Sequence, residues 1–165
     1  NLPYYITTPI IMLLLESETE WDTLVFMVQK EVAQRLAAEP GTKDYSSLSV
    51  AVKYYSEPKL AFTVSRNCFI PKPDVDSAVV KLKKRELPFA KNINKEFFFK
   101  VVRSSFSQRR KTLLNSLGTQ PWLEGGKNSL KESLKALNIK ETVRAEELTL
   151  EQFAKLSEKL TQIND

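Results

Sequence analysis

The sequence contains no histidine, one cysteine and only four glycines among its 165 residues. Without histidine and with a single cysteine, the chain has neither the ligands of an ordinary zinc site nor a cysteine–histidine nucleophile pair. The lone Cys68 leaves no partner for an internal disulfide, which is typical of a reducing compartment. We therefore expect a cytoplasmic protein without a metal site, in which Cys68 packs as a small buried hydrophobe.

Long hydrophobic runs are missing as well. The longest apolar run, residues 10–15, is far shorter than the roughly 20 residues that a helix needs to cross a bilayer. Hydrophobic residues make up 42% of the chain and charged residues 27%, as in a soluble globular protein. We therefore expect no signal peptide and no membrane partner.

Positive charge is concentrated in one central segment. Residues 81–111 carry 11 basic and 2 acidic side chains, or +9, whereas residues 1–80 carry −3 and residues 112–165 carry −1. A lysine-rich face exposed to solvent is the commoner explanation of such a run. Here the segment is also rich in arginine and aromatic residues, which favours a polyanionic partner and nucleic acid in particular.

The chain opens with Asn1-Leu2-Pro3-Tyr4, followed by Tyr5. Pro3 lacks an N–H and pushes Leu2 toward an extended conformation, so the Leu2 carbonyl is directed away from any helix. Together with the side-chain oxygen of Asn1, this carbonyl offers a pair of acceptors to a planar amine. Tyr4 can stack on the ring that carries the amine. An ordinary strand-to-helix turn with Tyr4 in the core is the alternative, and four residues alone do not decide between the two.

The segment that follows has the pattern of an α/β unit. The continuous apolar run at 24–28 predicts a strand covered on both faces, as in a parallel sheet. A helix is expected at 29–38, before the turn at Pro40. Residues 45–55 fit a strand or a helix, and their serine cap and apolar spacing favour the helix.

Two further strands flank a proline-rich loop. Residues 59–65 alternate apolar and polar side chains, and residues 77–82 form a second apolar run. The loop Phe69-Ile70-Pro71-Lys72-Pro73 must be extended, because its two prolines do not fit inside a helix or a central strand. A hairpin-like pair of strands with a rigid loop is therefore predicted.

From about residue 95 the pattern is helical, with helices predicted at 95–106, 108–117, 128–137 and 150–160. Thr149 and Gln152 form a capping-box pair before the last helix. A domain boundary is expected near Leu87-Pro88, which gives an α/β domain at 1–87 and a small all-α domain at 88–165.

The first motif resembles the Asn-(Leu/Pro)-Pro-Tyr motif of adenine N6-methyltransferases. The loop resembles a more specific signature, Phe-x-Pro-x-Pro-x-Val-x-Ser, of the rRNA adenine dimethyltransferases, the group that includes KsgA and Erm. In this sequence the residues of the signature are Phe69, Pro71, Pro73, Val75 and Ser77. In that family the two acceptors draw the lone pair of the amine out of conjugation, so that it attacks the methyl group of S-adenosyl-L-methionine. The phenylalanine stacks on the adenine opposite the tyrosine. The resemblance implies that the catalytic residues are Asn1, Leu2, Pro3, Tyr4 and Phe69, with Asn1 also contacting the cofactor.

The basic segment extends the resemblance. Residues 106–113 are similar to the basic helix that opens the C-terminal domain of the family, and no acidic residue lies between Lys100 and Lys111. Basic side chains within about two helical turns can contact phosphates without reading bases. We expect contacts to RNA from Lys72, Arg103, Arg109, Arg110 and Lys111.

The chain departs from the family in the cofactor half. Members hold S-adenosyl-L-methionine with a glycine-rich loop after their first strand, and none of the glycines at 41, 118, 125 and 126 has the required spacing. The sequence therefore resembles the C-terminal part of such an enzyme, with a partial Rossmann-like methyltransferase sheet, and we expect it to be inactive alone. The strand at 24–28 would lack a neighbour, which favours association with the missing half, a dimer or swapped assembly, or marginal stability.

The leading hypothesis is dimethylation of adenines in the 16S rRNA of the small ribosomal subunit, a step of ribosome biogenesis. The segment Ser77-Ala78-Val79-Val80 and the helical tail favour the KsgA branch over an Erm-type methyltransferase of 23S rRNA. A DNA adenine methylase fits the proline loop and the basic tail less well. A helical RNA-binding module without catalysis is the remaining alternative, which the intact motif residues disfavour.

Overall fold

The computed structural model describes residues 1–85 and 93–164, and these divide into two compact units. The first unit contains residues 1–39 and 48–85, and the second contains residues 40–47 and 93–164. The segment 40–47 thus groups with the C-terminal unit. The predicted boundary at 87–88 lies outside the described residues.

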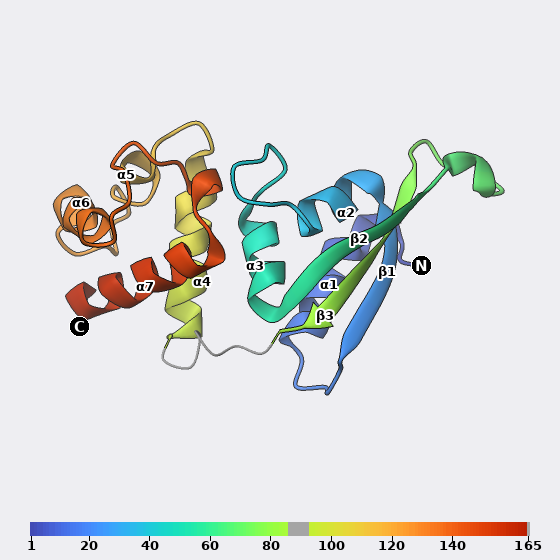
Figure 1. Ribbon diagram of the computed structural model, residues 1–165, viewed down its shortest axis with the longest axis horizontal. Coiled ribbons are helices and arrows are strands. Elements are labelled where there is room, and N and C mark those ends of the chain that lie inside the picture. Colours follow the sequence, from blue (N-terminus) through green and yellow to red (C-terminus); the bar gives the residue numbers. More distant parts are fainter. Residues whose placement is uncertain (86–92, 165) are drawn as a thin grey trace. The chain divides into compact units, whose positions relative to one another are not determined.

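The first unit is a small antiparallel sheet with helices (Figure 1). Its strands pair in the order β1-β3-β2, and β3 runs antiparallel to both neighbours. The expected strand pair around the proline loop and the expected helix at 45–55 are confirmed. The elements are η1 (Tyr4–Ile6), α1 (Thr7–Glu16), β1 (Thr23–Gln29), α2 (Lys30–Leu36), α3 (Ser47–Tyr55), β2 (Ser56–Val64), η2 (Arg66–Cys68) and β3 (Ser77–Lys84).

Strand β1 corrects one expectation, because it is antiparallel to β3 and buried on one face only. Phe26 and Val28 are buried, whereas Val25 is 60% exposed. Successive side chains of a strand point to opposite faces, and helices cover only one of these faces. Within residues 1–85 and 93–164, β3 is the only strand that pairs with β1. The other backbone edge of β1 has no strand partner among these residues and is contacted at the Met27 carbonyl by the Leu2 N–H.

Helices α1, α2 and α3 supply the apolar layer on the buried face. The register pairs Phe26 with Val80 and Val28 with Ala78, which places these four side chains on the same face. Burying a valine or phenylalanine side chain, such as that of Val80 or Phe26, stabilises the fold by about 1.5–3 kcal/mol. The core consists of Ile11, Leu15, Phe26, Val28, Ala33, Leu36, Val52, Ala78, Val80 and Leu82.

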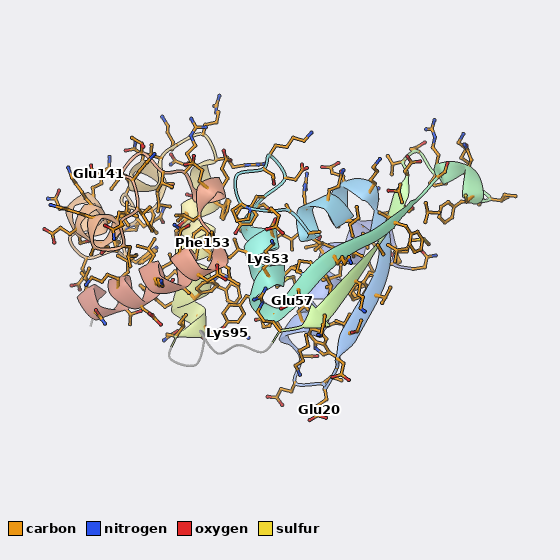
Figure 2. All side chains as sticks on the ribbon, viewed as in Figure 1. Glu20, Lys53, Glu57, Lys95, Glu141 and Phe153 are labelled. Atoms are coloured by element: carbon orange, nitrogen blue, oxygen red, sulfur yellow. The ribbon has the colours of Figure 1, made fainter. Side chains whose placement is uncertain are left out.

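The second unit contains only helical elements among its described residues. They are α4 (Lys95–Ser105), η4 (Phe106–Gln108), α5 (Leu113–Ser116), α6 (Gly126–Ala136), η5 (Ala145–Glu147) and α7 (Leu150–Asn164). The predicted capping box is confirmed, since the Gln152 N–H donates to the Thr149 Oγ1 and the Thr149 N–H donates to the Gln152 Oε1, at 3.2 and 2.9 Å. Phe153 projects from α7 and is fully buried against Phe106 (Figure 2).

The helix predicted at 108–117 is wrong. The chain leaves α4 through η4, turns at Lys111, whose N–H donates to the Gln108 carbonyl, and forms only the short helix α5. The Leu113 N–H donates to the Val143 carbonyl at 2.8 Å. This long-range bond takes the donor that a helix continuing through 113 would direct at its own preceding turn.

Cys68 is exposed in η2, between β2 and β3, rather than buried as expected. Its thiol therefore takes no part in the core. No helix in the described ranges combines the length and apolar character that a membrane span requires. Among the same residues, no three histidine, cysteine or carboxylate side chains cluster as metal ligands.

Candidate active site

A cavity of about 240 Å³ in the first unit joins the two sequence motifs. Since one water molecule in the liquid takes about 30 Å³, the cavity has room for a small planar ring system. Tyr4 and Phe69 thus line the same cavity, although they are far apart in the sequence. The lining residues are Asn1, Leu2, Pro3 and Tyr4 from the first motif and Phe69, Pro71 and Pro73 from the loop between β2 and β3.

The backbone of the first motif is fixed on β1. The Leu2 N–H donates to the Met27 carbonyl at 3.4 Å, and Pro3 is extended, with φ −60° and ψ 132°. The Pro3 carbonyl accepts from the Ile6 N–H at 3.3 Å and from the Thr7 hydroxyl at 2.9 Å. These contacts hold the turn from the extended motif into η1 and α1.

Two hydrogen-bond acceptors remain open at this turn. Within the described part of the chain, neither the Leu2 carbonyl nor the Asn1 side chain makes a hydrogen bond. Both residues line the cavity. Pro3 directs the Leu2 carbonyl away from the helix, and the bonds from Ile6 and Thr7 go to the carbonyl of Pro3 instead. The Asn1 side-chain oxygen and the Leu2 carbonyl are therefore adjacent acceptors to which no described residue donates.

Tyr4 is held by a residue to which the sequence assigned no role. Its hydroxyl lies 2.8 Å from the Ser77 Oγ atom, and Ser77 is 1% exposed at the first position of β3. The Phe-x-Pro-x-Pro-x-Val-x-Ser signature already contains this serine, so its position was available as a signal. What the sequence could not show is that the serine bonds the tyrosine of the other motif.

Phe69 sits on a loop that is tied at its base. Its N–H donates to the Arg66 carbonyl at 3.4 Å, and the Ser65 Oγ accepts from the Asn67 N–H at 3.3 Å. The peptide bond between Ile70 and Pro71 is cis. The two hydrogen bonds at the base of the loop hold the backbone that presents the partly buried Phe69 to the cavity.

The basic residues selected from the sequence are all exposed but do not form one helix. Lys72 is in the proline loop of the first unit, Arg103 is on α4, and residues 109–111 follow η4 in the second unit. In the described ranges, no ion pair involves any of them. The Arg109 guanidinium donates to the Lys43 carbonyl at 2.6 Å, whereas the side chains of Arg110 and Lys111 make no hydrogen bond or ion pair among the described residues.

The sequence pattern of the family described as "Ribosomal RNA adenine dimethylase" matches residues 1–162. The chain belongs to the ribosomal RNA adenine dimethylase family. Curated proteins similar to this chain include the "Ribosomal RNA small subunit methyltransferase A" of Listeria welshimeri, 51% identical over 158 residues. The protein of the same name from a Geobacillus species is 51% identical over 164 residues.

These relatives are longer than this chain. The alignments cover 95% and 99% of this chain but 54% and 56% of the Listeria and Geobacillus proteins. The chain thus spans about half the length of the curated relatives it matches.

Two solved structures resemble this chain in fold. A dimethyladenosine transferase from Plasmodium falciparum has a TM-score of 0.82 and 30% identity, and the match covers 94% of this chain and 63% of the other. The 23S rRNA methyltransferase ErmE has a TM-score of 0.71 and 26% identity, with coverage of 98% and 63%. Both similarities include the sheet and the C-terminal helices.

Proposed function

We propose that this chain is the base-binding and RNA-binding part of an S-adenosyl-L-methionine-dependent methyltransferase that dimethylates N6 of adenines in small-subunit 16S rRNA. One observation carries the proposal: the Asn1–Tyr4 motif and Phe69 line a single cavity, in which two acceptors are open. The family membership supports the reaction class. The names of the Listeria and Geobacillus relatives favour the small subunit as the target.

The cavity would hold an adenine swung out of its RNA strand. Tyr4 and Phe69 would stack on its two faces, and such base–aromatic stacking contributes about 1–3 kcal/mol per base. The Asn1 side-chain oxygen and the Leu2 carbonyl would accept the two hydrogens of the exocyclic amine. This grip turns the nitrogen lone pair out of the ring's π system, so that it becomes nucleophilic.

No strong base is required before the amine attacks. The methylated amine carries a positive charge and is acidic enough to lose its proton afterwards, which agrees with a chain that contains no histidine. The role of this chain in the reaction is therefore to orient the base and polarise its amine. Proximity and orientation of this kind can supply a large part of a rate enhancement.

The cofactor does not fit the residues of this chain alone. Gly41, Gly118, Gly125 and Gly126 all lie in the second unit, and none follows a strand. The phosphate- and nucleotide-binding turns of doubly wound sheets need glycine directly after a strand. S-adenosyl-L-methionine supplies the methyl group when it is bound, and Asn1 is the residue of this chain that we place beside it.

The remaining length of the protein would complete both the sheet and the cofactor site. Apart from the bond between Leu2 and Met27, the outer edge of β1 has no strand partner among the described residues and is suited to pair with a further strand. We therefore propose that the three strands are one end of a larger Rossmann-like methyltransferase sheet. The second unit would serve as a helical rRNA-binding domain. Its phosphate contacts are assigned to Arg103, Arg109, Arg110 and Lys111, with Lys72 contributing from the proline loop.

The test uses the full-length protein, that is, this chain with the further length that its relatives carry. With labelled S-adenosyl-L-methionine and purified ribosomal subunits, label should enter the small subunit and leave the large one unlabelled. Asn1→Ala should abolish transfer. The affinity for rRNA should stay within about twofold, because it comes mainly from phosphate contacts, to which Asn1 does not contribute. Asn128→Ala, which removes an exposed amide on α6, is the matched control.

The outcomes separate the alternatives. Label in the large subunit would support an Erm-type methyltransferase, for which the ErmE structure is the relevant comparison. Wild-type transfer by Asn1→Ala would remove Asn1 from its role. Normal rRNA binding with no transfer by the unsubstituted full-length protein would favour a non-catalytic RNA-binding module.

A further inference from the structure

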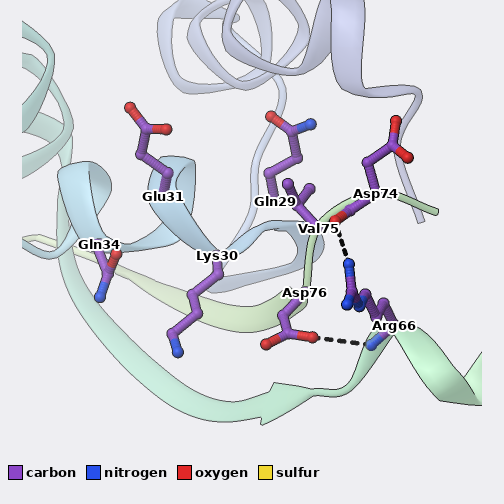
Figure 3. Close-up of a pocket in the computed structure, with 8 residues that line it drawn as sticks. All are labelled: Gln29, Lys30, Glu31, Gln34, Arg66, Asp74, Val75 and Asp76. Atoms are coloured by element: carbon purple, nitrogen blue, oxygen red, sulfur yellow. Dashed lines mark hydrogen bonds between the residues drawn. The ribbon is translucent and has the colours of Figure 1, made fainter.

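The base of the proline loop is closed by two hydrogen bonds between Arg66 and the residues that lead into β3, and a third bond ties Asp76 to α2. The Arg66 N–H donates to the Asp76 Oδ1 atom at 3.0 Å, and the Arg66 guanidinium donates to the Asp74 carbonyl at 3.0 Å. The Asp76 carbonyl in turn accepts from the Lys30 N–H at 3.0 Å, at the start of α2. Figure 3 shows Arg66 beside Asp74 and Asp76 at the end of the loop.

Hydrogen bonds connect this closed loop base to both Phe69 and Tyr4. The Arg66 carbonyl accepts the Phe69 N–H, so the position of Phe69 follows that of Arg66. Ser77, the next residue after Asp76, bonds the Tyr4 hydroxyl. The dipeptide Asp76-Ser77 is therefore a common support, from which one ring is placed through Arg66 and the other through Ser77.

We propose that Asp76 is a positioning residue, which sets the separation of the Phe69 and Tyr4 rings by holding the Arg66 backbone. The inference rests on the proposed function, since it assigns a role within the same base-binding cavity. Asp76 does not line that cavity and does not touch the base. It acts through Arg66 and Phe69.

The charges around the closure do not favour a direct contact between Arg66 and RNA phosphate. The neighbouring cavity, of about 460 Å³, is lined by the acidic Glu31, Asp74 and Asp76 and by the basic Lys30 and Arg66, and Glu31 also pairs with Arg35. The acidic and basic groups thus balance, and the cavity carries no excess positive charge to attract a phosphate. The Arg66 guanidinium instead serves the loop, through the Asp74 carbonyl.

The test compares three substitutions in the full-length protein, assayed with small ribosomal subunits. Asp76→Ala removes the acceptor of the Arg66 N–H, and we expect kcat/KM for rRNA to fall about fivefold. Asp76→Asn keeps an acceptor oxygen at the same place and should remain within about twofold of the unsubstituted protein. Asp74→Ala is the matched control, because it removes the same charge two residues away while the carbonyl that binds Arg66 stays.

A double-substitution cycle separates positioning from a general loss of stability. If Asp76 acts through the ring, Asp76→Ala should cause less than about a twofold further loss in a Phe69→Ala background. Amide hydrogen exchange at Arg66 and Phe69 should accelerate in Asp76→Ala, while exchange in the core strand β3 stays unchanged. Should Asp76→Ala fold poorly, Asp76→Glu, which keeps the charge but moves the acceptor by one methylene, provides the second variant and should accelerate exchange at Phe69 as well.

Each result bears on one of the two proposals. If Phe69→Ala retains full activity, the stacking role in the proposed function is wrong. If Phe69→Ala is impaired while Asp76→Ala has normal kcat/KM and normal exchange at Phe69, the positioning role of Asp76 is wrong and the proposed function stands. Independent, multiplicative losses in the double variant would also contradict the positioning role.

Discussion

The Tyr4 hydroxyl and the Ser77 Oγ atom share a hydrogen bond of 2.8 Å across 73 positions of sequence. The bond joins the tyrosine of one motif to the serine of the other, and Ser77 is almost fully buried. A tyrosine that stacks on a base through its ring face has its hydroxyl free for such an anchor. The two motifs are thus parts of one structural arrangement.

Removing this hydrogen bond should weaken catalysis without abolishing it. A net hydrogen bond contributes about 0.5–1.5 kcal/mol, so Ser77→Ala in the full-length protein should lower kcat/KM about two- to tenfold. Tyr4→Phe keeps the stacking ring and removes the same bond, and its loss should be similar. Steady-state methylation of small subunits measures both.

The double variant Tyr4→Phe/Ser77→Ala provides the control for that pair. Because each single substitution already breaks the bond, the double variant should be little worse than either one. Tyr4→Ala should be far worse, since it removes the ring. Equal activities of Tyr4→Phe and Tyr4→Ala would show that the ring face does not hold the base.

The exposed cations after η4 should contribute affinity for RNA without sequence preference. Arg110→Ala and Lys111→Ala should each weaken rRNA binding and reduce the slope of log K against log salt by about one. Filter binding of the full-length protein across a salt series measures this slope. Arg109 is less suitable for this test, because its guanidinium also donates to the Lys43 carbonyl and a substitution of Arg109 would change the local structure.

Lys155→Ala is the charge-matched control for the salt series. Lys155 is exposed on α7, outside the basic segment. Its substitution should leave the slope unchanged. An equal decrease for all three variants would mean that the whole surface of the unit, rather than the segment at 109–111, attracts the RNA.

The isolated chain 1–165 should self-associate or melt without full cooperativity, because one edge of β1 has no strand partner among the described residues and Val25 is exposed. Val25→Lys should reduce the association, since a charge on an edge strand opposes pairing. Size-exclusion chromatography and thermal unfolding report on the two parts of this prediction.

Leu60→Lys on β2 is the matched variant at the other edge. Strand β2 carries Pro58 and a register irregularity between Leu60 and Phe62, features that already protect an edge from pairing. We therefore expect this substitution to leave the association unchanged. A monomeric chain with one sharp melting transition would contradict the prediction for β1.

Much of the fold follows from local patterns in the sequence. The prolines at 71 and 73 require an extended loop, and the strands on either side pair as expected. Helix α3 forms where serines precede an apolar helical spacing. Patterns of this kind are reliable when one local feature, such as a missing donor or a cap, restricts the backbone.

The errors arise where a distant partner decides the structure. The run at 24–28 is apolar at every position, so periodicity does not reveal that Val25 lies on an uncovered face. The helix predicted at 108–117 fails because Leu113 bonds Val143, 30 positions away. For the site, the sequence identified Tyr4 and Phe69 through motifs, but the supports at Ser77 and Asp76 are contacts that only the folded chain shows.

The most direct test of the account is a structure of the full-length protein bound to its rRNA substrate. The account predicts an extruded adenine between the rings of Tyr4 and Phe69, with its N6 atom within hydrogen-bonding distance of the Asn1 side-chain oxygen and the Leu2 carbonyl. An adenine bound elsewhere, or rings that contact each other with no base between them, would contradict it.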